Sequence, residues 1–305
     1  MKYCYLAKGC GLVMIKCDES GYVEICDERF WYQIYGADKK GIPLIVVNGG
    51  PGCSMSYLIE PIALLSDKRP VIFYDQRDSG KSENGRDKSL WTLEKFVEDF
   101  SNILEYFNFD KVHMLGQSWG TMLIVEYILK NKPSNIMSLI FSASCFSSPL
   151  WASDQKRLLK SIPHDLRSSI EECESKKDFN SHSYIDAINY YYKLHLCRSE
   201  IWPECLDDIN LELYEYMVGP SEFTITGILK DCTCAERLEE IKLPTLLTCG
   251  EFDESTPETN EYYQKLIEGA ELVVLPGTSH EHHLESPQAY LNTIGDFLQR
   301  VENQI

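Results

Sequence analysis

Apolar residues in the first 145 positions form short continuous runs that alternate with stretches of helical period. Short runs such as 43–47 and 71–74 are typical of strands that are buried on both faces of a parallel sheet. In the segment 90–107, apolar residues recur with helical spacing, which predicts an amphipathic helix. In chain order the pattern predicts strands at 22–25, 29–35, 43–47, 71–74, 112–115 and 136–141, and helices at 90–107 and 121–129. This alternation predicts an α/β fold with a mostly parallel, doubly wound sheet.

The pattern changes at position 147. From 147 to 239 there are no strand-like runs, only amphipathic stretches interrupted by prolines at positions 149, 163, 203 and 220. The α/β pattern then resumes with strands at 244–249 and 272–275 and helices at 259–267 and 287–301. We therefore predict a core formed by residues 1–146 and 240–305, with an inserted helical cap at 147–239.

Length and charge limit the kinds of partner and the domain organisation that the chain can have. At about 150 residues per domain, 305 residues suit two domains or one large α/β domain with an insertion. The 29 Lys and Arg against 47 Asp and Glu leave a net charge of −18, which disfavours nucleic acid and anionic membrane as partners. No apolar run approaches the roughly 20 residues of a membrane-spanning helix. No signal peptide is recognisable, so we expect a cytoplasmic protein.

The twelve cysteines are scattered and contain no C-x-x-C pair. Cys232 and Cys234 stand two positions apart without a second pair that would complete a zinc site. The segment from His280 to His283 lacks the H-E-x-x-H spacing of zinc peptidases. We expect free thiols, with no metal and no organic cofactor.

Gly116-Gln117-Ser118-Trp119-Gly120 lies between a predicted strand and a predicted helix. This is the G-x-S-x-G turn that exposes a nucleophilic serine at the end of a sheet, although a serine N-cap between two glycines is the plain alternative. A second glycine-rich loop, Asn48-Gly49-Gly50-Pro51-Gly52, follows the strand 43–47. Its position suits the loop that supplies one oxyanion N–H, with the other from Trp119 after the nucleophile.

A serine nucleophile needs a histidine base and an orienting acid, which follow it in the order acid, then histidine. His280 lies in a loop after the last predicted strand and is the candidate base. His282 and His283 beside it fit either the loop surface or a supporting position. Asp253, three residues after Gly250, is the candidate acid; its competitors are Glu251 and Glu254.

These motifs together resemble proline iminopeptidases (prolyl aminopeptidases), which have an α/β-hydrolase fold with a helical cap. The resemblance also covers Tyr74–Ser82, Gly277–His280 and the cap stretches His195–Pro203 and Met217–Gly227. It runs from about residue 20 to the C-terminus, and it is greatest for the tricorn-interacting aminopeptidase type. One departure is Asn48, where the family usually has histidine.

Carried over to this chain, the resemblance implies Ser118 as nucleophile, Asp253 as acid and His280 as base, with Gly50 and Trp119 as the oxyanion donors. It also implies that Glu222 and Glu254 bind the free α-ammonium of the substrate. From the residues alone, solvated surface charge is the preferred interpretation of both glutamates.

The resulting prediction is a serine exopeptidase that releases an N-terminal residue, preferably proline, from short peptides with a free N-terminus. One alternative is an esterase or amidase that acts on small acyl substrates, for which Glu222 and Glu254 would have no partner. A second is a catalytically inactive interaction module on the same fold.

Overall fold

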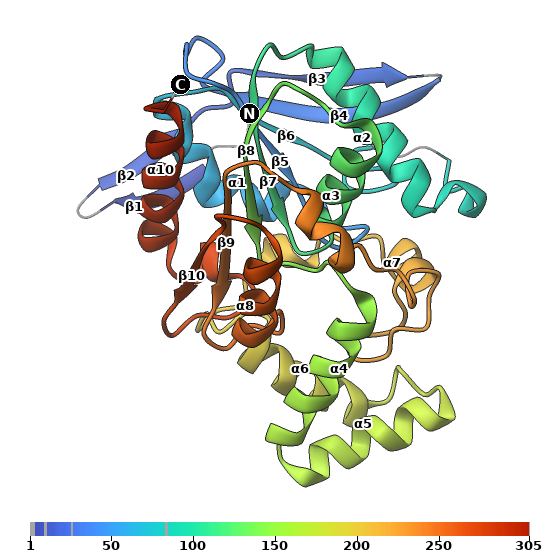
Figure 1. The fold of residues 1–305 in the computed structure, drawn as a ribbon. Helices are drawn as coiled ribbons and strands as arrows, with labels where there is room; N and C mark the ends of the chain where they lie inside the picture. Colours follow the sequence, from blue (N-terminus) through green and yellow to red (C-terminus); the bar gives the residue numbers. More distant parts are fainter. Residues whose placement is uncertain (1–3, 9–10, 26, 83–84, 305) are drawn as a thin grey trace.

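The computed structural model describes residues 4–8, 11–25, 27–82 and 85–304. Its centre is an eight-stranded sheet with the strand order β10-β9-β8-β7-β5-β6-β4-β3 (Figure 1). Neighbours from β10 to β6 pair in parallel, and β4 and β3 are added antiparallel at one edge. The strands are β3 Glu19–Ile25, β4 Glu28–Tyr35, β5 Leu44–Val47, β6 Val71–Tyr74, β7 Val112–Gln117, β8 Ile136–Ser142, β9 Thr245–Gly250 and β10 Glu271–Leu275. The predicted α/β fold with a mostly parallel, doubly wound sheet is confirmed.

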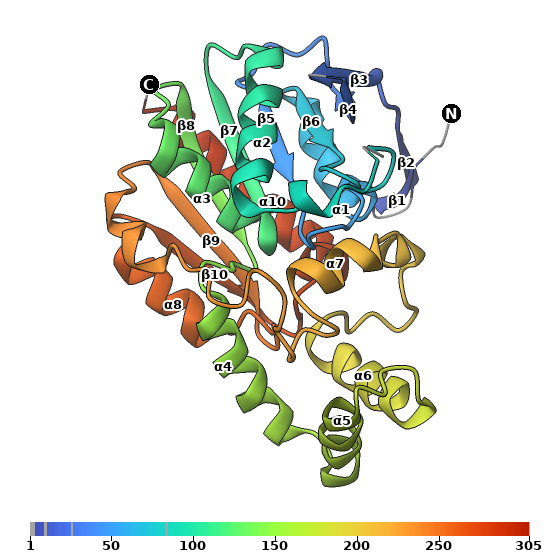
Figure 2. The same cartoon turned by 90° about the vertical axis from the view of Figure 1, so that its right-hand side faces the viewer.

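Helices cover both faces of the sheet (Figure 2). On one face lie α2 (Leu93–Phe107), α3 (Trp119–Asn131) and α8 (Pro257–Leu266), and on the other lie α1 (Ser56–Ile62) and α10 (Pro287–Glu302). Strands β5, β6, β7 and β9 are buried along their whole length. Because these strands contact helices on both sides, their apolar runs are continuous rather than alternating.

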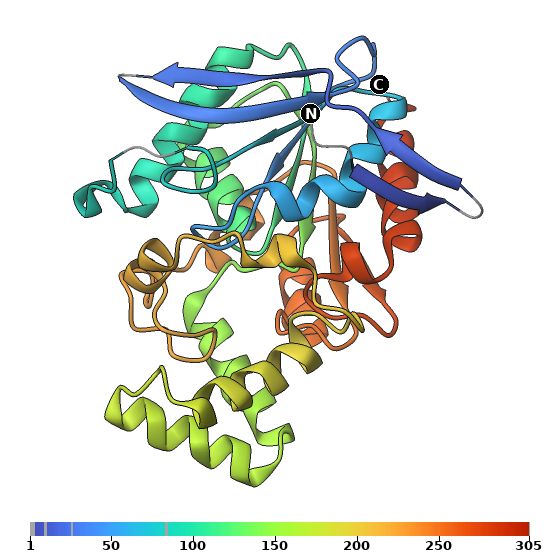
Figure 3. The same ribbon diagram turned by 180° about the vertical axis from the view of Figure 1, so that it is seen from behind.

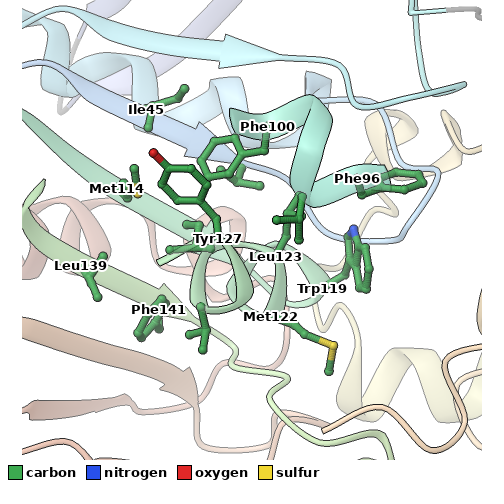
Figure 4. Close-up of a cluster of buried hydrophobic side chains, with 14 of the residues drawn as sticks. Ile45, Phe96, Phe100, Met114, Trp119, Met122, Leu123, Tyr127, Leu139 and Phe141 are labelled. Atoms are coloured by element: carbon green, nitrogen blue, oxygen red, sulfur yellow. The ribbon is translucent and has the colours of Figure 1, made fainter. Parts of the chain in front are cut away.

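The core on the α2–α3 face packs aromatic and aliphatic side chains from both helices against the sheet (Figure 4). The labelled members are Phe96 and Phe100 of α2, Trp119, Met122, Leu123 and Tyr127 of α3, and Ile45, Met114, Leu139 and Phe141 of the strands. Phe96 contacts Trp119 edge-to-face, with ring centroids 5.9 Å apart. The residue that follows the predicted nucleophile is therefore held by core packing.

The segment between β8 and β9 is helical throughout its regular elements. It contains α4 (Ser148–Leu158), α5 (His164–Lys176), α6 (His182–His195) and α7 (Leu211–Met217), with the 3₁₀ turns η3 (Leu159–Ser161), η4 (Glu204–Asp207) and η5 (Ala235–Glu240). Helices α4 to α6 extend away from one end of the sheet, and α7 lies closer to it (Figures 1 and 3). Buried side chains including Ile162, Ile170, Tyr184, Tyr191 and Phe223 give this segment its own small core.

Several short elements escaped the sequence-based prediction. They are the hairpin β1 (Cys4–Lys8) and β2 (Gly11–Ile15), helix α1, the turns η1 (Ala63–Asp67) and η2 (Lys88–Leu90), and α9 (His282–Glu285). The helices and turns among them are much shorter than the window of about 11–18 residues in which helical period is recognised, and α1 contains Pro61. The helix predicted to begin at 90 begins at Leu93, because the Thr92 side chain accepts a hydrogen bond from Lys95 N and ends the preceding turn.

The carboxyl ends of β5, β7, β9 and β10 meet at one edge of the sheet, because these strands are parallel. The loops that follow them carry Gly50, Ser118, Asp253 and His280, respectively. In open α/β sheets, ligands bind at this edge. Among the helices in the described part of the chain, none is both long and apolar enough to cross a membrane.

Candidate active site

Ser118 occupies the sharp turn between β7 and α3. Its φ of 51° and ψ of −122° are strained for a non-glycine residue, and its N–H donates to Ser142 O at 2.9 Å. The turn needs a glycine two residues later, because a Cβ at Gly120 would lie 2.3 Å from Val47 O. This backbone places the Ser118 side chain beyond the end of the sheet and at the N-terminus of α3.

His280 and Asp253 are bonded to each other and buried. His280 Nδ1 lies 2.8 Å from Asp253 Oδ1, and the two residues are 4% and 1% exposed. The carboxylate also accepts from the backbone N–H groups of Ser255 and Gly250, at 2.7 and 3.2 Å. These bonds fix the carboxylate and orient the imidazole of His280, which lines the same cavity as Ser118.

The loop Asn48–Gly52 is held by hydrogen bonds of Asn48 to Cys53 and to Gln76, which follows β6. Asn48 Nδ2 donates to Cys53 O at 2.6 Å, which closes the loop on itself. Gln76 donates to Asn48 O at 2.7 Å and accepts from the Trp119 indole at 3.0 Å. Asn48 therefore has a structural role in this loop, and Gln76 ties the loop to the Ser118 turn. Gln76 belongs to the stretch Tyr74–Ser82, in which no single residue was predicted to have a role.

Two cavities meet at Ser118 and Gly50. The larger, of about 260 Å³, is also lined by His280, Glu222 and Glu254. The smaller, of about 40 Å³, is mainly apolar, and its wall includes Trp119, Met122, Cys145, Trp151, Val218, Ile225 and Leu229. We call the first the acidic cavity and the second the apolar cavity.

The two glutamates implied by the resemblance line the acidic cavity. Glu254 is only 1% exposed, and its Oε2 has no hydrogen-bond partner among the described residues. Glu222 is half-buried and accepts a hydrogen bond from the Tyr214 hydroxyl. The interpretation of Glu254 as a solvated surface charge is therefore wrong, and a buried carboxylate oxygen without a partner requires an explanation, such as a catalytic role or a bound water or ion.

Glu251, His282 and His283, the other polar residues near the predicted acid and base, all have structural contacts. Glu251 is exposed and accepts from Gly277 N at 2.8 Å, so it holds a turn. His282 and His283 are fully buried, which rules out the loop surface for both. His282 Nε2 lies 2.9 Å from Ser142 Oγ, and His283 Nε2 donates to Tyr57 O at 3.0 Å. Both side chains anchor the loop that presents His280.

The helical segment is joined directly to the candidate site. The carbonyl of His195, at the end of α6, accepts from the N–H groups of His280 and Glu254, at 3.0 and 3.3 Å. Leu196 O accepts from Glu281 N at 2.9 Å. Sequence reasoning missed Glu281, a 4% exposed carboxylate in the acidic cavity, whose only signal was its position next to His280.

The acidic surroundings change the proton affinities of these groups. Burial lowers the pKa of His280, but the charges of Asp253, Glu254 and Glu281 outweigh burial and raise the pKa to about 10. Burial and the charge of Glu222 raise the pKa of Glu254 well above its ordinary value. Each carboxylate that ionises therefore favours a positive charge nearby.

The described residues offer no metal centre: none of their His, Cys, Asp and Glu side chains form a group of three or more that could hold an ion. The nine described cysteines are free, and the remaining predicted thiols, Cys4, Cys10 and Cys26, lie outside the residues whose side chains are described.

The fold and the strand-end loops define an α/β hydrolase. A family model described as the alpha/beta hydrolase fold matches residues 42–287 of this chain.

Comparison with individual proteins identifies the family within this class. The proline iminopeptidase of Heyndrickxia coagulans is 43% identical over 286 residues, which cover 92% of this chain and 99% of that protein. That of Saccharolobus solfataricus is 34% identical over 290 residues and 93% of each chain. The crystal structure of a proline iminopeptidase from Mycobacterium smegmatis matches with a TM-score of 0.86 at 32% identity, covering 94% of this chain and 99% of that one. The chain belongs to the proline iminopeptidase family.

Proposed function

We propose that this protein is a serine aminopeptidase that releases N-terminal proline from short peptides. The observation that carries the proposal is the position of Ser118, between a small apolar cavity and two glutamates in a wall that contains no Lys or Arg among its described residues. An N-terminal residue has a side chain, a carbonyl and an α-ammonium that fit these three features. The family membership of the chain supports the same activity.

In this proposal, Ser118 Oγ attacks the first carbonyl of the peptide and His280 takes its proton. Asp253 holds the imidazole in the required orientation and stabilises its positive charge. The backbone N–H groups of Gly50 and Trp119 donate to the oxyanion; that of Trp119 is available because it lies in the first turn of α3. His280 then protonates the leaving amine, and water hydrolyses the acyl-enzyme.

The substrate's α-ammonium pairs with Glu222 and Glu254. Burial raises the pKa of both carboxyl groups, so the binding of a cation restores a charge that burial disfavours. A charged donor in a desolvated site also forms stronger hydrogen bonds than a neutral one. An acylated N-terminus would remove the cation and add bulk where these two side chains lie.

The apolar cavity receives the side chain of the first residue. Its volume of about 40 Å³ is small, which favours a compact side chain over a large aromatic one. Proline suits it further because its ring is rigid, so little conformational entropy is lost on binding.

Hydrolysis of a panel of aminoacyl-arylamides tests the proposal. We expect kcat/KM to be highest for the proline substrate, lower for alanine, and lowest for phenylalanine and tryptophan. Equal rates for proline and tryptophan would contradict the placement of the side chain in the apolar cavity. Absence of turnover with every free aminoacyl-arylamide would overturn the aminopeptidase itself.

The raised pKa of His280 predicts an unusual pH dependence. His280 must be neutral to act as a base, and its pKa of about 10 keeps it protonated below that value in the free enzyme. The rate of Ser118 labelling by a neutral fluorophosphonate should therefore keep rising with pH well above the ordinary histidine pKa of about 6.5. In Glu254→Gln the rise should begin at lower pH, because a negative charge that stabilises the imidazolium is gone. A wild-type rate that levels off by about pH 7 would contradict this electrostatic picture.

We also propose three finer features. Residues 147–239 act as a cap, supported by the separate core of this segment and its backbone bonds to the loops of His280 and Glu254. The cap stretch Met217–Gly227 supports placement with the tricorn-interacting aminopeptidase type. The free thiols of the nine described cysteines support a reducing, cytoplasmic location.

A further inference from the structure

Glu281 has no role in the mechanism above, although it lies in the wall of the acidic cavity directly after His280. Its side chain is buried, the residue being 4% exposed, and its Oε2 accepts no hydrogen bond from the described residues. The nearest basic atom to Oε2 that the structure identifies is His283 Nδ1, at 3.5 Å. Burial lowers the pKa of His283 to about 3, so that imidazole is neutral and gives Glu281 no counter-charge.

Among the described residues, the positive charge that acts on Glu281 already has a partner. His280 counteracts the effect of burial on Glu281, but its Nδ1 is paired with Asp253 at 2.8 Å. Burial still raises the pKa of Glu281 to about 8. A buried carboxyl with such a pKa is largely protonated at neutral pH, and a cation bound beside it would favour the ionised form.

The surroundings of Glu281 bear on which part of a bound peptide it would contact. Glu281 lines the acidic cavity and is not part of the apolar cavity. After burial, its charge is the largest influence that raises the thiol pKa values of Cys53 and Cys205, so it lies toward these two walls. Glu281 directly follows His280, which donates its proton to the departing amine, and on this ground we place Glu281 on the departing side of the peptide.

Beyond Glu281, the wall of the cavity remains acidic. Asp207 and Asp208 at the end of η4 are exposed and line the same cavity. Asp207 accepts from the Trp202 indole at 3.0 Å, which places an aromatic ring beside it. Carboxylates and an aromatic face both attract a cationic side chain.

We propose that Glu281, with Asp207 and Asp208 further out, binds a basic side chain at the residue that follows the scissile bond. The proposal rests on the proposed aminopeptidase function and specifies its substrate class: peptides that begin with proline followed by lysine or arginine. The ammonium or guanidinium group donates to the free oxygen of Glu281 while the scissile carbonyl contacts Ser118.

Two amidated dipeptides that differ by one charge test this proposal. Prolyl-lysine amide and prolyl-norleucine amide have side chains of similar length, and only lysine is charged. In the wild type at about pH 8, where Glu281 is partly ionised and the substrate's α-amino group is still partly protonated, we expect kcat/KM for the lysine peptide to exceed that for norleucine by about tenfold or more. A wild-type ratio near one overturns the proposal without any variant.

Glu281→Gln assigns the effect to this side chain. We expect the lysine-to-norleucine ratio to fall to within about threefold of one, whatever the absolute rates. Glu204→Gln is the matched control: it removes the same charge from an exposed position on η4 and should leave the ratio unchanged. If the lysine-to-norleucine ratio of kcat/KM is unchanged in Glu281→Gln, other residues cause the preference and the proposal is overturned.

The same measurements distinguish an error in this inference from an error in the proposed function. If proline arylamide and prolyl-norleucine amide are both hydrolysed without a preference for lysine, the aminopeptidase stands and the role of Glu281 is wrong. If neither is hydrolysed, the aminopeptidase itself is wrong.

Discussion

Ser118→Ala should lower kcat on proline arylamide by about 10⁶-fold, the scale observed when a serine hydrolase loses its nucleophile. The strained turn that presents Ser118 is held by backbone bonds and by glycine packing, none of which uses the hydroxyl. The variant should therefore fold with an unchanged melting temperature while losing the acyl-enzyme route. Steady-state kinetics and thermal unfolding of the same preparation measure both quantities.

Two comparisons control for this result. Ser175→Ala, which changes an exposed serine in α5, should keep wild-type activity. Ser118→Ala/His280→Ala should be little slower than the worse single variant, because members of a catalytic triad act as a unit. Multiplicative losses in the double variant would mean that the two side chains act in different steps, contrary to the proposed mechanism.

Glu254→Gln should lower kcat/KM on proline arylamide by about 10- to 150-fold, since a hydrogen bond to a charged group contributes about 1.5–3 kcal/mol. The reason is the burial of Glu254: its unpartnered oxygen lies in the cavity wall, and the isosteric amide removes the charge without leaving a hole. The loss should be far smaller on the aryl ester of cyclopentanecarboxylic acid, which has a ring like that of proline and no ammonium.

Glu251→Gln provides the matched control for this second result. Glu251 is three residues before Glu254 in the same loop, but it is exposed, and its side chain accepts a hydrogen bond from the Gly277 backbone. It should affect the charged and the neutral substrate alike and only slightly. Equal losses on both substrates in Glu254→Gln would mean that this glutamate holds the cap in place and does not bind the ammonium.

The sheet was predictable because its strands are buried on both faces, which leaves continuous apolar runs such as Leu44–Val47 and Val71–Tyr74. Helix α1 was not predictable, because seven residues with an internal proline show no period. The limits of α2 depended on one hydroxyl, that of Thr92, and side-chain caps of this kind shift a boundary by a few residues.

Some residues of the candidate site were likewise predictable from the sequence, and the burial of others was not. Ser118, Asp253 and His280 follow strand ends, so a correct strand order brings their loops to one edge of the sheet. The burial of Glu254 and Glu281 could not be read from local sequence, because both are covered through the carbonyl groups of His195 and Leu196 in a distant helical segment. A carboxylate in a polar loop has the same sequence signal whether it is solvated or buried.

Hydrolysis of proline arylamide compared with N-acetylproline arylamide tests most directly whether the enzyme recognises a free α-ammonium beside Ser118. Acetylation deletes the cation that Glu222 and Glu254 are proposed to bind, and it adds bulk where these side chains line the cavity. We predict rapid hydrolysis of the free substrate and no detectable hydrolysis of the acetylated one at the same enzyme concentration. Efficient cleavage of N-acetylproline arylamide would contradict the aminopeptidase and favour an amidase that acts on small acyl groups.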